Sequence, residues 1–237
     1  KRLVDFLPSH AVVKTGGEQG IHAVSAAPYG SVSMLPVTYG YLLMLGAEGL
    51  KHVTEMAILN ANYLASSFEK LGFKILFKGK QGRVGHEMIW DCSAFNKEYG
   101  ISELDIAKRL MDFGFHAPTL SFPVHGTLMV EPTESEPKEE LDRFIEALKT
   151  IREEMCEVAE GKADKTDNVL KNAPHTHKVL TADEWTHTYP RSKAAYPLPW
   201  VAENKFWPQV GRVDDGYGDR NLMCTCDPLY DYVNDEN

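Results

Sequence analysis

The chain has 237 residues, of which 43% are hydrophobic and 25% charged, a composition typical of a globular protein with one large or two small domains. Its formal net charge of −9 argues against nucleic acid as a partner, because phosphate binding requires a basic face. No apolar run reaches the ~18 residues that a membrane-spanning helix needs, so no membrane partner is expected.

The first part of the chain predicts two helices. A loop at Pro28–Ser31 precedes a helix over residues 32–45, which Ser31 can cap at its N-terminus. A second helix is predicted over residues 49–71 from the spacing of its apolar residues. These residues are Val53, Met56, Ala57, Ala61, Leu64, Phe68 and Leu71.

The middle of the chain predicts a small α+β layer. Residues 73–78 and 87–92 read as two strands that can pair as a hairpin, and residues 127–131 read as a third strand. Ser102 and Asp105 resemble a capping box for a helix that ends at Phe113. Thr133 or Ser135 is expected to cap a further helix with its own apolar stripe. The two helices are expected on one face of a mostly antiparallel sheet.

The segment between the third helix and the third strand, His116 to Gly126, is polar and contains Pro118 and Pro123. Proline fixes φ and removes a backbone donor, so the loop is expected to be stiff. A stiff polar loop between a helix and a strand suits a binding edge. On composition alone, a plain surface connection shaped by Pro118 and Pro123 is the favoured interpretation.

After Gly161 the helical periodicity is lost and prolines become frequent. Three of the four tryptophans lie here, at Trp185, Trp200 and Trp207. Disordered tails are poor in aromatic residues, so we expect an ordered, irregular extension that wraps over the body of the protein or over a neighbour.

Three long motifs, in order, resemble the C-terminal part of glycine decarboxylase, the P-protein of the glycine cleavage system. They are VSAAPYGS at residues 24–31, HAPTLSFPVHGTLMVEPTESE at 116–136 and RVDDGYGDRNLMCTC at 212–226. The resemblance extends from about Phe6 to about Pro228.

The resemblance implies the C-terminal part of a fold-type I transferase that depends on pyridoxal 5′-phosphate. Residues 1–45 would be the end of the large cofactor-binding domain. Residues 46–160 would be a linking helix and the small α+β domain, and residues 161–237 the extension. The segment after the Schiff-base lysine returns to the cofactor in such folds, which places Ala27, Tyr29, Gly30 and Ser31 near it.

The family's Schiff-base lysine lies in a His-Lys motif before a run of glycines, and that combination does not occur in this sequence. The family's first half, a degenerate copy of the same fold, is also absent. No residue of this chain is therefore expected to be catalytic, and the chain alone is expected to be inactive and to bind the cofactor poorly.

In the whole enzyme, the resemblance implies that glycine loses CO2 and that its aminomethyl group passes to the lipoyl arm of the H-protein. A long arm needs a channel, and His116, Thr119 and Ser121 are the candidates for lining it. Arg212 and Arg220 could meet a carboxylate or phosphate there. Structural docking of their charged, glycine-rich segment is the favoured alternative.

The chain has four cysteines, too few and too scattered for a secreted disulfide scaffold, so a reducing compartment is expected. Cys224 and Cys226 could be redox-active or could be plain reduced thiols. Zinc sites usually use C-x2-C spacing, whereas these cysteines form a C-x-C pair that lies far in sequence from His175 and His177, so no metal is expected.

Expected partners are the lipoylated H-protein, the missing N-terminal half of the same enzyme and, when full length, a second copy in a homodimer. The expected location is the cytoplasm in a bacterium and the mitochondrion in a eukaryote. The main alternative is a non-catalytic interaction module that keeps the fold. The third is another pyridoxal-phosphate enzyme of the same superfamily, which the long motif match disfavours.

Overall fold

The computed structural model describes residues 4–8, 16–21 and 31–222. The chain forms two compact units, residues 1–56 and 57–237. The first unit holds two short 3-10 helices, Val4–Phe6 and Val32–Met34, and the first part of helix α1 (Leu35–Lys70).

Helix α1 is interrupted at Gly46, whose φ of 60° and ψ of −173° are not helical. A side chain at that backbone conformation would be strained, and glycine avoids the strain. The interruption falls between the two helices predicted over residues 32–45 and 49–71, so the prediction of two helical segments is confirmed.

The second unit contains a four-stranded antiparallel sheet in the order β1-β2-β4-β3. The three predicted strands are present but shorter, as β1 (Lys74–Leu76), β2 (Met88–Asp91) and β4 (Thr127–Val130). The fourth, β3 (Thr119–Leu120), lies within the segment predicted as a loop. Two residues are too few to show an alternating pattern, and the strand is defined only by its pairing with β4.

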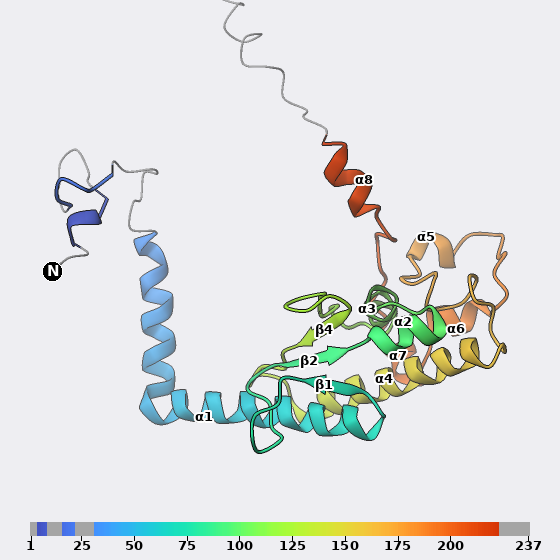
Figure 1. Ribbon diagram of the computed structural model, residues 1–237, viewed down its shortest axis with the longest axis horizontal. Helices are drawn as coiled ribbons and strands as arrows, with labels where there is room; N and C mark the ends of the chain where they lie inside the picture. The colour runs from blue at the N-terminus through green and yellow to red at the C-terminus, as the bar shows by residue number, and fades with distance from the viewer. Residues whose placement is uncertain (1–3, 9–15, 22–30, 223–237) are drawn as a thin grey trace, which may run out of the picture. The chain divides into compact units, whose positions relative to one another are not determined.

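One face of the sheet is buried against helices. Trp90 of β2 is completely buried, and its ring lies 5.5 Å from that of Phe68 in the second part of α1. Phe68 in turn lies 6.0 Å from Phe144 of helix α4 (Lys138–Ala159). Figure 1 shows the second part of α1 and α4 alongside the strands. This aromatic contact ties the two long helices to the centre of the sheet.

Helix α3 (Glu103–Asp112) adds Ile106 and Leu110 to the same core. Its predicted capping box is confirmed: the Ser102 hydroxyl accepts from the backbone N–H of Asp105, and the Asp105 carboxylate accepts from that of Ser102. Helix α2 (Ser93–Tyr99) was not predicted. Its first N–H, from Ser93, donates to the side chain of Asp91 at 3.0 Å, so the preceding strand supplies the cap.

The predicted start of the last long helix is wrong. Helix α4 begins at Lys138 after Pro137, and neither Thr133 nor Ser135 caps it. The Thr133 hydroxyl instead accepts from the backbone N–H of Ser135 at 3.3 Å in a local turn. Pro137 lacks an N–H and has a preset φ, so it suits the residue at which a helix starts.

The tail from residue 161 to residue 213 is ordered and lies against the body, with short helices at α5 (His177–Leu180), α6 (Arg191–Ala195) and α7 (Pro199–Glu203). Trp200 packs on Phe113 and Phe115, with ring centroids 6.2 Å from each. Helix α8 (Asp215–Arg220) follows. The expectation of an ordered, aromatic extension is confirmed for these residues. Among the described helices, none is both long enough and apolar enough to cross a membrane.

Candidate functional site

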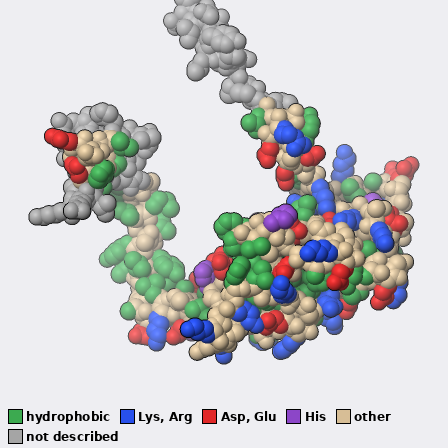
Figure 2. Space-filling view, in the orientation of Figure 1, with side chains coloured by type: hydrophobic (Ala, Val, Ile, Leu, Met, Phe, Trp, Pro, Cys, Tyr) green, Lys and Arg blue, Asp and Glu red, His purple; other side chains and the backbone are tan. Residues whose placement is uncertain are grey.

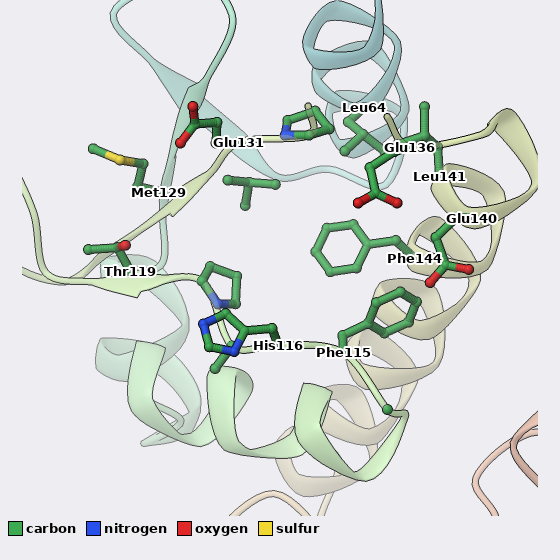
Figure 3. Close-up of a pocket in the computed structure, with 15 residues that line it drawn as sticks. Leu64, Phe115, His116, Thr119, Met129, Glu131, Glu136, Glu140, Leu141 and Phe144 are labelled. Atoms are coloured by element: carbon green, nitrogen blue, oxygen red, sulfur yellow. The ribbon is translucent and has the colours of Figure 1, made fainter. Parts of the chain in front are cut away.

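A hollow of about 440 Å³ lies between the end of the sheet and the long helices, lined by residues of the motif at 116–136. Its walls come from α1, the loop after α3, β4 and the start of α4. Figure 3 shows His116 and Thr119 on one wall and the Phe144 ring and the Glu136 carboxylate on the other. Its size falls within the range of small-molecule sites, roughly 300–1,000 Å³.

The floor of the hollow is fixed by core packing. Leu64 and Leu141 are 1% and 4% exposed, and the Phe115 and Phe144 rings meet edge to face at 5.0 Å. Asn60 of α1 donates to the backbone carbonyls of Thr133 and Glu136 at 2.9 and 3.3 Å. The buried side chain of Asn60 thus holds the segment that carries Glu136 in place, so this wall of the hollow is preformed.

The charged groups around the hollow are acidic. Glu131, Glu136 and Glu140 line it, whereas no lysine or arginine is among the lining residues. Glu140 pairs with Arg143, which lies outside the lining set. The hollow therefore disfavours a phosphate or carboxylate group and suits an aliphatic or neutral one.

The predicted channel residues separate in the structure. His116 and Thr119 both line the hollow. Ser121 does not, because its hydroxyl donates to Glu103 at 2.8 Å and accepts from the backbone N–H of Gly126 at 3.1 Å. Its φ of 50° is held by these bonds, so its visible role is to shape the loop.

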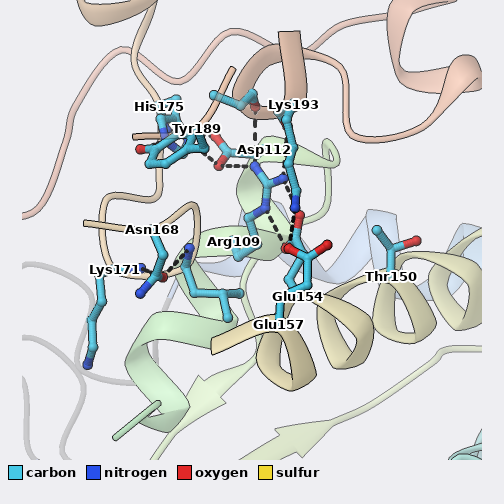
Figure 4. A network of polar contacts seen from close by, with 12 residues as sticks. Arg109, Asp112, Thr150, Glu154, Glu157, Asn168, Lys171, His175, Tyr189 and Lys193 are labelled. Atoms are coloured by element: carbon cyan, nitrogen blue, oxygen red, sulfur yellow. Dashed lines mark hydrogen bonds and ion pairs between the residues drawn. The ribbon is translucent and has the colours of Figure 1, made fainter. Parts of the chain in front are cut away.

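A buried ionic network lies between α3, α4 and the tail (Figure 4). Arg109 is completely buried and binds Glu154 with two parallel hydrogen bonds of 3.0 and 2.7 Å. It also donates to Asp112 at 3.0 Å and to the backbone carbonyls of Lys193 and Ala194 at 3.0 and 3.2 Å. Burial alone would lower the pKa of Arg109, but the two carboxylates outweigh burial and raise it.

Asp112 extends the network to the tail. Its carboxylate accepts from the backbone N–H of His175 at 2.7 Å and lies 2.8 Å from the imidazole Nδ1. The other ring nitrogen of His175 lies 2.8 Å from the Tyr189 hydroxyl. Burial raises the pKa of Asp112, but the His175 hydrogen bond and the Arg109 charge outweigh it and leave the pKa below its ordinary value. His175 is thereby engaged in docking the tail.

Arg212 is also engaged in docking. Its guanidinium donates to Asp105 at 2.7 Å, to the Ala173 carbonyl at 2.7 Å and to the Leu170 carbonyl at 2.8 Å. Asp105 also accepts from Lys171 at 2.7 Å. Burial raises the pKa of Asp105, but these donors and the backbone of Ser102 outweigh it and hold the pKa below its ordinary value. All three guanidinium nitrogens have partners, as the docking interpretation requires.

The other predicted site residues are separate from the hollow. Arg220 ends α8. Ser31 is exposed and its hydroxyl lies 2.7 Å from that of Ser33. Ala27, Tyr29, Gly30, Cys224 and Cys226 lie outside the described residues. Within the part of the chain that is described, no three His, Cys, Asp or Glu side chains converge as a metal site would need.

Sequence reasoning missed the acidic and aromatic wall of the hollow. Glu136 and Glu140 read as an ordinary acidic helix start, and Phe144 as part of an apolar stripe. Glu136 is the last residue of the motif at 116–136, and Glu140 and Phe144 follow it within eight residues. Only the packing of α4 across the end of the sheet brings these three side chains to the hollow.

Comparisons with known proteins give a consistent picture. A family model described as "Glycine dehydrogenase, C-terminal domain" matches residues 53–175. "Glycine dehydrogenase (decarboxylating)" of Flavobacterium johnsoniae is 60% identical over 233 residues, which are 98% of this chain and 24% of that protein. The protein of the same name from Bdellovibrio bacteriovorus is 55% identical over 231 residues, 97% of this chain and 24% of its own length.

A eukaryotic relative, "Glycine dehydrogenase (decarboxylating), mitochondrial" of Dictyostelium discoideum, is 56% identical over 231 residues, 97% of this chain and 23% of its own length. The chain thus spans about a quarter of the length of the curated relatives it matches.

Proposed function

Because the chain belongs to the glycine dehydrogenase (decarboxylating) family, we propose that it acts as the C-terminal region of an enzyme that decarboxylates glycine. In that reaction the aminomethyl group is transferred to the lipoyl arm of the H-protein. The observation that carries the proposal is the continuous match of 60% identity over 98% of the chain. The motif at residues 116–136 lies within this match and supplies much of the lining of the hollow.

Pyridoxal 5′-phosphate is the proposed cofactor, and it supplies the electron sink when glycine loses CO2. The hollow does not fit its phosphate, because its charged lining groups are carboxylates and it offers neither a lysine for a Schiff base nor an arginine for the phosphate. The family resemblance implies instead that the cofactor lies near Ala27, Tyr29, Gly30 and Ser31, and this placement is kept as a proposal.

The hollow is proposed to serve the arm that accepts the aminomethyl group. Its apolar floor of Phe115, Phe144 and Leu141 suits an aliphatic chain, and its carboxylates repel competing anions. His116 and Thr119 would contact the arm as it passes. Arg212, whose donors are all occupied, would contribute by holding the tail in place rather than by binding a ligand.

The first part of α1 supports the proposal that residues 1–45 belong to a larger domain. Figure 2 shows apolar side chains along the face of this helix that is in view, and at helical spacing the apolar positions of residues 35–44 are distributed around the helix axis. The large exposed ones, each 45–87% accessible, are Leu35, Val37, Tyr39, Tyr41, Leu42, Leu43 and Met44. A helix that is apolar all round belongs in the interior of a large protein. Residues 46–160 and 161–237 are proposed as the small domain and its extension.

The enzyme is proposed to act with the lipoylated H-protein and, when full length, as a homodimer. The proposed location is the cytoplasm in a bacterium and the mitochondrion in a eukaryote. The alternative of a non-catalytic interaction module is not favoured, because the relatives that match the chain are named as glycine dehydrogenases. The redox role of Cys224 or Cys226 stays a prediction.

The test compares this chain with a chimera, in which the first three quarters of the Flavobacterium johnsoniae relative precede it in one polypeptide. We expect the chimera to show an absorbance band with pyridoxal phosphate that glycine shifts, and to release CO2 from glycine with H-protein present. The isolated chain should do neither. A glycine-sensitive band in the isolated chain would show that one of its own lysines anchors the cofactor.

A further inference from the structure

The loop after β3 exposes apolar side chains at its tip. Leu120, Phe122 and Val124 are 37%, 59% and 37% exposed. They alternate along the chain with Ser121, which faces the body and bonds Glu103. Three exposed apolar side chains thus lie within five residues, from the end of β3 into the loop that follows it.

The loop is braced in this conformation. The backbone N–H of Ser121 donates to the Thr127 carbonyl at 2.8 Å, and that of Gly126 to the Ser121 hydroxyl at 3.1 Å. The Thr127 hydroxyl donates to the Val124 carbonyl at 2.5 Å. Ser121 also holds a φ of 50°, which a serine rarely adopts. These bonds fix the backbone on both sides of the exposed apolar residues.

The neighbouring strand edge is open as well. In the described sheet, β3 pairs with β4 alone, so its outer edge has no strand beside it. A fixed apolar cluster beside an open strand edge is typical of a contact surface, and a central aromatic residue commonly carries most of the binding energy in such a contact.

We propose that the surface formed by Leu120, Phe122 and Val124 docks the part of the family's longer polypeptide that precedes this region. The inference rests on the proposed placement of the chain within a longer enzyme. The relatives are about four times as long as the matched segment, so a large partner within the same polypeptide exists for the surface.

The size of the surface favours this occupant over a second copy. Even a large aromatic side chain buries only ~200 Å², so three partly exposed side chains stay below the ~800 Å² per partner that a stable interface between separate molecules buries. A contact between domains of one polypeptide needs less area, because the covalent connection raises the effective concentration. The surface is therefore suited to an intramolecular contact.

The first experiment measures hydrogen exchange at residues 119–126 in the isolated chain and in the chimera described above. Exchange in the loop should slow by about tenfold or more in the chimera, because a docked surface opens rarely. Unchanged exchange would overturn the proposal. Glycine-dependent CO2 release is measured on the same chimera. If the chimera releases CO2 but exchange in the loop is unchanged, this inference alone is contradicted. If exchange in the loop slows but the chimera releases no CO2, the proposed function alone is contradicted.

The second experiment introduces Phe122→Ala into the chimera and measures the same hydrogen exchange. The substitution should speed exchange of the loop by about tenfold or more toward that of the isolated chain, because truncation of a central aromatic contact weakens docking. Phe77→Ala is the control, because Phe77 is also an exposed phenylalanine, 69% accessible, and lies outside the proposed surface. Equal effects of the two substitutions would overturn the proposal. So would self-association of this chain that Phe122→Ala abolishes, which would assign the surface to a second copy.

Discussion

Arg109 is the residue on which the contact between tail and body depends most. It is fully buried, and its loss would leave Glu154 and Asp112 buried without their cation. Breaking a buried ion pair from one side costs about 3–5 kcal/mol, so we expect Arg109→Ala to lower the free energy of unfolding by that amount. Urea denaturation followed by tryptophan fluorescence measures it.

Lys74→Ala is the control for that measurement. Lys74 pairs with Asp91 at 2.9 Å, but its side chain is 71% exposed. Exposed pairs contribute about 0–1 kcal/mol, so this variant should remain close to the parent. Losses of similar size in the two variants would contradict the role assigned to the buried network.

Lys205 makes a pH-dependent contribution at the same place. Its ammonium donates to the Asp112 carbonyl, and burial lowers its pKa from 10.5 to about 8. The folded pKa is depressed, so the cost of burying the charge is fully present below pH 8. That cost disappears as the pH rises from about 8 to 10.5, because folding then releases a proton that the unfolded chain still holds.

We therefore expect the stability of the parent protein, relative to Lys205→Met, to increase between pH 8 and 10.5. Thermal unfolding of both proteins across this range measures the difference. Burial raises the pKa of Tyr189 and of Cys92, which weakens stability at high pH, but both proteins share that effect and it cancels. A constant difference between the two proteins would show that Lys205 does not titrate in this window.

At the scale of elements, two of the serines that were predicted to cap helices, Ser102 and Ser135, have different outcomes. Ser102 caps α3 through its hydroxyl, whereas the Ser135 hydroxyl caps nothing, since α4 begins three residues later. Ser102→Ala should cost about 1 kcal/mol, the usual value for a lost cap, and Ser135→Ala should stay within about 0.5 kcal/mol. Chemical denaturation of the pair measures both. A larger loss at Ser135 would refute the observed start of α4.

The sequence predicted the elements whose signals are local. The apolar stripes of α1 and α4 and the capping box of α3 each lie within one segment of the chain, and all are present. Helix α2 was missed because its cap comes from Asp91 in the preceding strand, and β3 because it exists only through pairing with β4.

The polar network was missed for a related reason. Asp105, Arg109 and Asp112 follow one another at helical spacing, a pattern that does not by itself indicate burial. Their partners are distant in sequence: Glu154 lies 45 residues after Arg109, and His175 lies 63 residues after Asp112. Within the candidate site, His116 and Thr119 were candidates for the lining, whereas Glu136, Glu140 and Phe144 on the opposite wall were not. Such contacts are decided by tertiary packing rather than by the local pattern.

At the scale of the whole molecule, the two units differ in how far they bury their hydrophobic residues. The second unit has a closed core with Leu64, Trp90 and Leu148 at its centre. The first part of α1 has no such core in the described residues, and Leu43 and Met44 are 66% and 87% exposed. An apolar surface of this kind is a site of association unless it is covered.

We therefore expect the isolated chain to bind a hydrophobic dye and to self-associate through the first part of α1. Replacing Leu43 and Met44 by glutamine should reduce both effects. The four tryptophans, at 90, 185, 200 and 207, all lie in the second unit, so their fluorescence reports on its unfolding alone. The double variant should leave that unfolding curve unchanged. If it shifts the curve, the exposed helix is contributing to the core of the second unit, and the two units do not stabilise themselves independently.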